Sequence, residues 1–327
     1  MKKGGFLGIV LFLLLCLSVF FNLLFIVLLT YKGTKILLPE SPYDEVVLFP
    51  GSKNSKIVVI PLTGTIGFSQ TNPLGNSMVE DLKEAFLQAG ADPDVKAVVV
   101  SVDSPGGEVT ASDAIYHSLQ TLAKKKPVIY YMNSMGASGA YYAACGASWI
   151  MCSPTTFTGS IGVIISTLNY RDLLGKIGLQ AVIFKSGKFK DMLNPAREMT
   201  PEEKNYVQQL VMQTYDRFLH VVATSRHLDP ETLRNGVADG RVLSGEDAYR
   251  DKLVDGLGYI EDAYNKAKEL SGAKNASIVN YKAQFSFSRF FHLLSESTVP
   301  QIRIELPQGF RALEPGRLYL IPSILVP

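Results

Sequence analysis

Short apolar runs alternate with amphipathic segments through residues 57–152, and this alternation constrains the fold more than any other feature of the sequence. The clearest run, residues 97–102 (AVVVSV), is apolar at five of six positions, which is typical of a strand buried on both faces of a parallel sheet. Strands that alternate with helices predict an α/β fold, in which right-handed crossovers place helices against a parallel sheet. The other strand-like runs are 57–61, 127–132 and 149–152, and the helical spacing recurs at 77–89 and 110–123.

Residues 6–29 form a second apolar feature, a stretch of 24 residues without a charged side chain. As a helix it would be about 36 Å long, which exceeds the roughly 30 Å thickness of the hydrocarbon core of a bilayer. A cleaved signal peptide is the alternative, but its apolar region is shorter and ends at small residues, whereas residues 30–32 read Thr-Tyr-Lys. We therefore expect one uncleaved N-terminal transmembrane helix.

The charges that flank this stretch are nearly balanced. Lys2 and Lys3 precede it together with the amino terminus, and Lys32 and Lys35 follow it. A short N-terminal tail that carries its charges close to the membrane favours a cytoplasmic N-terminus. The sequence therefore predicts a single-pass protein of the cell membrane whose main domain lies on the extracytoplasmic side.

The composition of the chain suggests four parts. Residues 1–35 form the anchor, 36–56 a linker rich in Pro, Ser, Gly and Lys, 57–272 one α/β domain, and 273–327 a C-terminal extension. The extension is rich in phenylalanine between residues 285 and 291. Two interpretations of it stay open: an amphipathic helix against the membrane or a neighbouring subunit, and an edge strand or unpacked tail.

Several classes of function lack support in the sequence. The 32 Lys and Arg against 30 Asp and Glu give no electrostatic basis for binding nucleic acid. The dinucleotide, P-loop and HExxH motifs are absent, and the four histidines are well separated, so we expect neither a cofactor nor a metal. Cys16 lies in the apolar stretch, which leaves Cys145 and Cys152 as small core residues rather than a disulfide framework.

Three glycine-containing loops follow predicted strands: 103–107 (DSPGG), 134–140 (SMGASGA) and 158–162 (TGSIG). Parallel strands end at one edge of a sheet, where open α/β sheets bind ligands. Backbone N–H groups of the first loop could form an oxyanion hole, which stabilises negative charge on a carbonyl oxygen. An ordinary Pro-Gly turn is the alternative at this position.

Ser138 lies in the second loop between small residues, as expected either for a nucleophile or for a turn. A nucleophilic serine needs a base, and no histidine occurs between His117 and His220. Three lysines follow in a loop-like stretch: Lys185, Lys188 and Lys190. A lysine acts as a base only when neutral, so burial must lower its pKa from about 10.4 to about 7–8. Spacing alone does not choose among the three.

Seven motifs occur in order between about Lys56 and Gly272: DSPGG, SMGASGAYY, TGSIGV, KSGKFKD, REMTPEE, ADGRV and LVDGLG. In this order and spacing they resemble the signal peptide peptidase A (SppA) family, Ser/Lys peptidases of the ClpP/crotonase fold. The resemblance implies ClpP/crotonase-like sheet layers with flanking helices, and ring-like homo-oligomers in which neighbouring subunits can share a site. It assigns Ser138 as nucleophile, Lys190 as general base, the N–H groups of Gly107 and Gly139 as the oxyanion hole, and Ser160 as a hydrogen-bond partner of the lysine amine.

The sequence and the resemblance together predict a membrane-anchored serine endopeptidase that cleaves signal-peptide remnants and other short hydrophobic peptides on the exported face. We expect such a peptide to pair by main-chain hydrogen bonds between 103–107 and 158–162, with pockets that favour small or aliphatic side chains. A crotonase-like acyl-CoA enzyme is one alternative, but it would usually use a carboxylate base in a soluble chain. A non-catalytic ring-forming scaffold is the other, but it would have no use for Ser138 together with Lys190.

Overall fold

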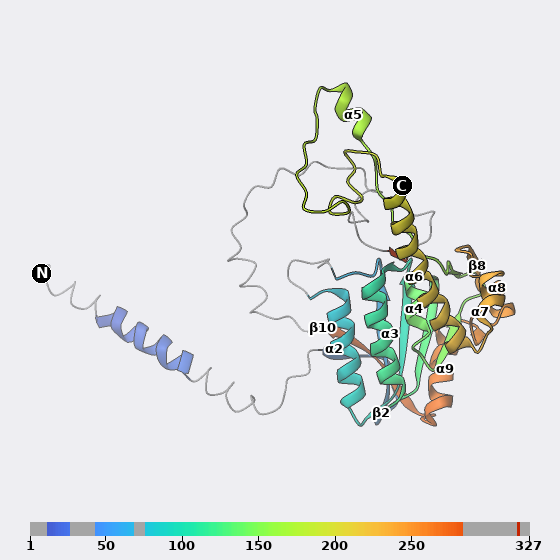
Figure 1. Cartoon of the computed structure of the whole chain (residues 1–327). Helices are drawn as coiled ribbons and strands as arrows, with labels where there is room; N and C mark the ends of the chain where they lie inside the picture. Colours follow the sequence, from blue (N-terminus) through green and yellow to red (C-terminus); the bar gives the residue numbers. More distant parts are fainter. Residues whose placement is uncertain (1–11, 27–42, 69–75, 284–318, 321–327) are drawn as a thin grey trace, which may run out of the picture. The chain divides into compact units, whose positions relative to one another are not determined.

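The computed structural model describes residues 12–26, 43–68, 76–283 and 319–320 (Figure 1). The chain divides into two compact units, Met1–Pro42 and Tyr43–Pro327. In the first unit, residues 12–26 are helical and exposed. In the described part of the chain, no helix is both long enough and apolar enough to cross a membrane. The predicted anchor, residues 6–29, extends beyond both ends of this described stretch.

A nine-stranded sheet forms the centre of the second unit, in the order β1-β10-β2-β3-β5-β6-β9, with β7 beside β5 and β8 beside β7. Neighbouring strands are parallel except in the β1–β10 and β7–β8 pairs, which confirms the predicted parallel α/β sheet. The strands are β1 (Tyr43–Phe49), β2 (Ser52–Thr63), β3 (Val95–Ser104), β5 (Val128–Ala137), β6 (Trp149–Cys152), β7 (Phe157–Gly159), β8 (Val242–Ser244), β9 (Gly256–Leu257) and β10 (Ala276–Ala283).

Helices cover both faces of this sheet (Figure 1). The larger core joins α2, α3, α4 and α6 to one face, and the smaller core packs Ala263 and Ala267 of α9 on the other face. Adjacent residues of β3 alternate between the two cores, Val98 and Val100 facing the first and Val99 the second. The helices are α2 (Met78–Ala91), α3 (Val109–Ala123), α4 (Gly139–Ala144), α5 (Arg171–Lys176), α6 (Pro201–Arg226), α7 (Pro230–Arg234), α8 (Gly245–Arg250) and α9 (Ile260–Ser271).

The start of α6 agrees with its sequence signature. The Thr200 hydroxyl accepts the N–H of Glu203 at 3.2 Å, and the Glu203 carboxylate accepts the N–H of Thr200 at 2.8 Å. Pro201 occupies the first turn, where its missing N–H costs nothing. This reciprocal capping fixes the first turn of a helix of 26 residues.

The sheet extends beyond the predicted domain boundaries 57–272. The predicted linker contributes β1 and the first residues of β2, and the predicted extension contributes β10. β10 lies between β1 and β2, where Ile278 is opposite Ile57 and both side chains are buried. The ring of Tyr43 stacks on that of Tyr281 with 5.7 Å between centroids. The phenylalanine-rich part of the extension lies outside the described residues.

Candidate active site

The three glycine-containing loops meet at the carboxyl edge of the sheet, as predicted. β3 and β5 pair up to Ser104 and Gly136, and β5 and β7 pair up to Ala137 and Gly159. Ser138 follows directly after β5, between the ends of the two neighbouring strands. The topology therefore places a serine hydroxyl and two glycine-rich turns at one position on the sheet.

Ser138 has an unusual backbone conformation, with φ 54° and ψ −113°. Side chains are rare in this region of conformational space, so the surrounding structure must hold it there. Its N–H donates to the carbonyl of Gly159 at 2.8 Å, and its carbonyl accepts the N–H of Tyr142 at 2.8 Å. The turn directs the chain from β5 into α4 at Gly139.

The Ser138 side chain is fully buried, and its Oγ has no hydrogen-bond partner among the described residues. A buried hydroxyl without a partner is uncommon, because leaving it unpaired costs about 1–3 kcal/mol. Strained backbone and an unpaired polar atom at one residue are typical of functional sites rather than of ordinary turns. Of the two interpretations of Ser138, these features favour the nucleophile.

Tyrosines hold α4 in place around this serine. The Tyr130 hydroxyl donates to the carbonyl of Ala140 at 2.8 Å, and that of Tyr141 donates to the carbonyl of Leu253 at 2.7 Å. The Tyr142 hydroxyl donates to the Asp113 carboxylate at 2.6 Å. Burial raises the pKa of all three phenols, so they stay neutral donors. These tyrosines are structural supports for the loop that carries Ser138.

The DSPGG loop is fixed by a residue that the sequence analysis did not single out. Ser104 is buried; its hydroxyl donates to the carbonyl of Gly64 at 2.6 Å and accepts the N–H of Gly106 at 3.2 Å. Gly107 lies so close to Ile66 that a Cβ there would come within 2.0 Å of the Ile66 carbonyl oxygen. Only glycine fits at this position, because the neighbour is backbone and cannot move aside.

Gly107 and Glu108 form the short strand β4, which pairs antiparallel with β11 (Tyr319–Leu320). In this pair Leu320 is opposite Gly107 and Tyr319 is opposite Glu108. An extended segment of chain can therefore lie along the predicted oxyanion loop as an added strand.

Ser160 lies next to Gly159, whose carbonyl binds the N–H of Ser138. Ser160 is also buried and has positive φ, 49°, and its N–H donates to the carbonyl of Arg241 at 2.8 Å. The fold thus brings Ser138, Gly139 and Ser160 together at the sheet edge. Among the described residues, no lysine amine lies within hydrogen-bond distance of the Ser138 hydroxyl.

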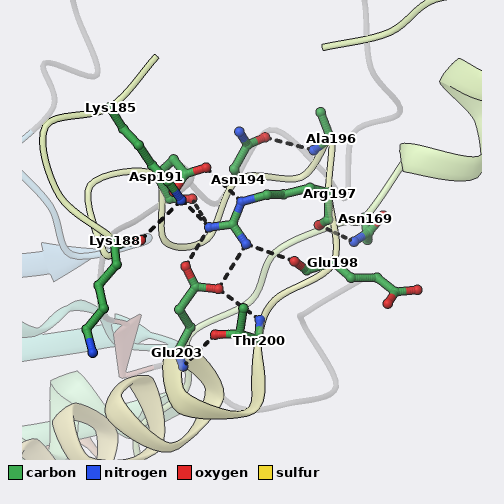
Figure 2. Close-up of polar contacts among 10 residues, drawn as sticks. All are labelled: Asn169, Lys185, Lys188, Asp191, Asn194, Ala196, Arg197, Glu198, Thr200 and Glu203. Carbon is green, nitrogen blue, oxygen red and sulfur yellow. Dashed lines mark hydrogen bonds and ion pairs between the residues drawn. The ribbon is translucent and has the colours of Figure 1, made fainter. Parts of the chain in front are cut away.

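Lys190 lies in an exposed turn between α5 and α6, where its N–H donates to the carbonyl of Gly187 at 3.1 Å. Its side chain makes neither a hydrogen bond nor an ion pair with the residues that the structure describes. The other two candidate lysines are ion-paired: Lys185 with Asp191 at 2.7 Å, and Lys188 with Glu202 at 2.5 Å. The amines of Lys185 and Lys188 are therefore both engaged in ion pairs within their own subunit, and Figure 2 shows that of Lys185 with Asp191.

Both cysteines among the described residues of the second unit are buried. Burial raises the pKa of the Cys145 and Cys152 thiols to about 12, so both are unreactive core residues, as predicted. Across the described residues, no three His, Cys, Asp or Glu side chains are grouped so that they could hold a metal ion.

Comparison with known proteins places the chain among peptidases. The family model "Peptidase family S49" matches residues 120–274, and the model "Clp protease" matches residues 65–156. The chain is 38% identical over 273 residues to a "Putative protease" of Methanocaldococcus jannaschii, an alignment that spans 79% of this chain and 84% of the relative. It is 36% identical over 256 residues to a "Putative signal peptide peptidase SppA" of Enterococcus faecium, spanning 76% and 73% of the two chains.

A plant relative is similar to this chain over a shorter alignment. The "Serine protease SPPA, chloroplastic" of Arabidopsis thaliana is 34% identical over 193 residues, which span 59% of this chain and 28% of the relative. Residues 120–274, which the S49 family model matches, contain the β5–α4 turn at Ser138. This chain belongs to peptidase family S49 and is a serine peptidase.

Proposed function

We propose that this chain is a membrane-anchored endopeptidase in which Ser138 is the nucleophile and Lys190 the general base. Its substrates are signal-peptide remnants and other short hydrophobic peptides on the extracytoplasmic side of the membrane. The observation that carries the proposal is the Ser138 hydroxyl, which is buried without a partner on a strained turn at the carboxyl edge of the sheet. Residues 6–29 supply the anchor, and the cytoplasmic N-terminus follows from the flanking charges.

The proposed reaction gives each of these groups a role. The Oγ of Ser138 attacks the scissile carbonyl carbon while the neutral amine of Lys190 accepts the hydroxyl proton. The N–H groups of Gly107 and Gly139 stabilise the oxyanion, and the proton on Lys190 then passes to the leaving amine as the C–N bond breaks. Water then loses a proton to Lys190 and attacks the acyl carbon; the ester C–O bond breaks, and Lys190 returns the proton to the Oγ of Ser138. Ser160 orients the lysine amine through a hydrogen bond.

We infer that the lysine reaches the serine of a neighbouring subunit. In one chain the Ser138 hydroxyl has no partner among the described residues, while Lys190 is exposed and unpaired. The segment around it exposes large apolar side chains, which favours burial against another copy. These are Leu168, Leu173, Ile177, Leu179, Val182 and Phe184, the last of them 96% exposed. A ring of subunits would cover this surface and complete each site.

The pairing of β11 with β4 supports an extended substrate. A peptide bound along β4 in the same way would place one of its carbonyls beside Gly107. Main-chain hydrogen bonds depend little on the side chains of the peptide, so selectivity would come from apolar pockets for small or aliphatic side chains.

A serine-directed phosphonate probe tests the proposal directly. We expect the full-length protein to be labelled at Ser138, and the Ser138→Ala variant to stay unlabelled. Labelling at another serine, or a folded oligomer that resists the probe and hydrolyses no peptide, would contradict the proposed site.

A further inference from the structure

Strand β5 changes its neighbour shortly before the chain reaches Ser138. Residues 129–132 of β5 pair with β6, and residues 135–137 pair with β7. Neither pairing includes residues 133–134. A strand that passes from one neighbour to another needs other donors for its carbonyl groups in the gap, because buried backbone groups are costly to leave unpaired.

Side-chain hydroxyls from the segment between β6 and β7 supply donors in this gap. The Thr156 hydroxyl donates to the carbonyl of Met132 at 3.1 Å and is also hydrogen-bonded to that of Asn133. It accepts the N–H of Ser153 at 3.0 Å, which ties the end of β6 to the same point. Thr156 is fully buried, so water does not compete for these contacts. The hydroxyl of Thr156 therefore takes the place of a neighbouring strand.

Thr158 makes the corresponding contact closest to the serine. It lies opposite Gly136 in the β5–β7 pair, its side chain is fully buried, and its hydroxyl donates to the carbonyl of Gly136 at 2.7 Å. The other side of Gly136 is filled by Met132, since a Cβ at residue 136 would come within 2.3 Å of the Met132 Cγ. Gly136 is thus held between the Met132 side chain and the Thr158 hydroxyl.

This contact lies two residues before Ser138. The next residue of β7, Gly159, accepts the N–H of Ser138 through its carbonyl at 2.8 Å. β7 therefore holds the end of β5 at two consecutive points, once through the Thr158 side chain and once through the main chain. The positive φ of Ser138, 54°, persists only while the surrounding structure holds it.

We propose that Thr158 is a positioning residue for the peptidase reaction. Its hydroxyl holds the carbonyl of Gly136 and thereby fixes the Oγ of Ser138 and the N–H of Gly139 relative to the scissile carbonyl. This inference rests on the proposed role of Ser138 as the nucleophile. Because the Thr158 side chain is fully buried and does not touch the peptide, its effect falls on kcat rather than on KM.

The test compares Thr158→Val, Thr158→Ser and Thr158→Ala in the full-length protein by steady-state peptide hydrolysis. Thr158→Val keeps the shape but has no donor, so we expect kcat to fall about 10- to 100-fold and KM to change less than about threefold. Thr158→Ser keeps the hydroxyl, and its kcat should stay within about threefold of the wild type. Thr158→Ala should resemble Thr158→Val. The rate at which a phosphonate probe labels Ser138 should follow kcat through the series.

Thr121→Val is the matched control. The Thr121 hydroxyl donates to the carbonyl of His117 at 2.9 Å on the exposed side of α3, so its loss should leave kcat and KM unchanged. Circular dichroism at the assay temperature establishes that each variant is folded. If Thr158→Val does not fold, the serine and alanine variants decide the matter, because they differ only in the hydroxyl. Failure of both variants without a hydroxyl to fold would make Thr158 a structural residue and overturn the inference.

A lower kcat in the two variants without a hydroxyl, with kcat kept in Thr158→Ser, supports the inference. A purely structural brace would lower the urea midpoint and leave the kcat of the folded enzyme unchanged, which would overturn it. An equal loss in Thr158→Ser and Thr158→Val, or an effect on KM alone, would also overturn it.

Ser138→Ala is measured in parallel, so that the proposed nucleophile and the role of Thr158 are tested separately. Normal turnover in Ser138→Ala would contradict the proposed nucleophile itself. Loss of turnover in Ser138→Ala with an unchanged kcat in Thr158→Val would contradict the role of Thr158 alone.

Discussion

At Ser138 the fold buries a hydroxyl that has no partner among the residues that the structure describes. We expect Ser138→Ala to lose peptide hydrolysis and to unfold at higher urea concentration than the wild type, with a gain of about 1 kcal/mol. The gain arises because the variant buries no unpaired hydroxyl, while the backbone strain at residue 138 is unchanged. Urea titrations of both proteins measure the difference. A less stable alanine variant would mean that the hydroxyl has a partner in the folded protein.

Ser104 supports the opposite wall of the site. Ser104→Ala removes a hydroxyl that bonds the carbonyl of Gly64 and the N–H of Gly106. We expect kcat to fall about 10- to 100-fold with KM nearly unchanged, because a displaced loop stabilises the oxyanion less well than the bound peptide. Steady-state kinetics measure the two constants. As a matched control, Ser118→Ala removes a helix-surface hydroxyl bonded to Ala114 and should leave both unchanged.

Substitutions of Lys190 and Lys188, two of the three lysines in the exposed loop, should differ in their effect on peptide hydrolysis. Lys190→Ala and Lys190→Arg should both abolish turnover, since a guanidinium stays protonated and cannot act as a base. Lys188→Ala removes an exposed ion pair with Glu202 and a cation–π contact with the ring of Phe189, and should change activity slightly. Peptide hydrolysis, with circular dichroism as the folding control, compares the variants. Loss of activity in Lys188→Ala with retention in Lys190→Ala would identify a different base.

At the scale of elements, α6 connects the loop that carries Lys190 to the helix that follows Ser138. In its first turn Glu203 pairs with Arg197 of that loop at 2.5 Å, and near its other end Phe218 is buried and contacts Tyr142 of α4 at 5.1 Å between ring centroids. A helix of 26 residues is about 39 Å long, so one rigid element joins the lysine-bearing loop to the helix that follows the serine.

The ion pair at the start of α6 should make stability depend on pH. The pKa of Glu203 is lowered from 4.5 to about 2, chiefly by its hydrogen bonds from Arg197. A lowered pKa stabilises the fold above pH 4.5, and this contribution is lost as pH falls toward about 2. We expect Glu203→Gln to be less stable than the wild type at pH 6, with a difference that shrinks below pH 4.5. Urea unfolding at several pH values measures it; a constant difference would contradict the ion pair.

The sequence predicts the helices and strands better than it predicts which strands pair with one another. Continuous apolar runs identified β2, β3 and β5, and the loops after them were placed at one edge because parallel strands end together. β1 and β10 were assigned to a linker and an extension because their pairing joins segments more than 200 residues apart, which local periodicity does not reveal. Ser104 and Arg197 lie within the DSPGG and REMTPEE motifs, but local spacing does not reveal the tertiary hydrogen bonds that these side chains make.

At the scale of the whole molecule, the separation of Ser138 from Lys190 predicts complementation. Separately inactive Ser138→Ala and Lys190→Ala subunits, mixed and allowed to exchange, should regain part of the wild-type activity. A mixed pair of neighbours can join an intact serine to an intact lysine. Native mass spectrometry confirms that mixed oligomers form, and hydrolysis is then measured. Mixed oligomers that stay inactive would show that each subunit supplies both groups of its own site.

Lys190 lies on the surface of its subunit, while Ser138 lies buried at the edge of the sheet. On the proposed arrangement, such a chain needs no propeptide to stay harmless during synthesis and export, because half of each catalytic pair is missing until subunits meet. Proteolysis would begin when the local concentration of subunits in the membrane exceeds a threshold, and dilution of the subunits would end it without an inhibitor. The dissociated subunit would then be the zymogen of this peptidase.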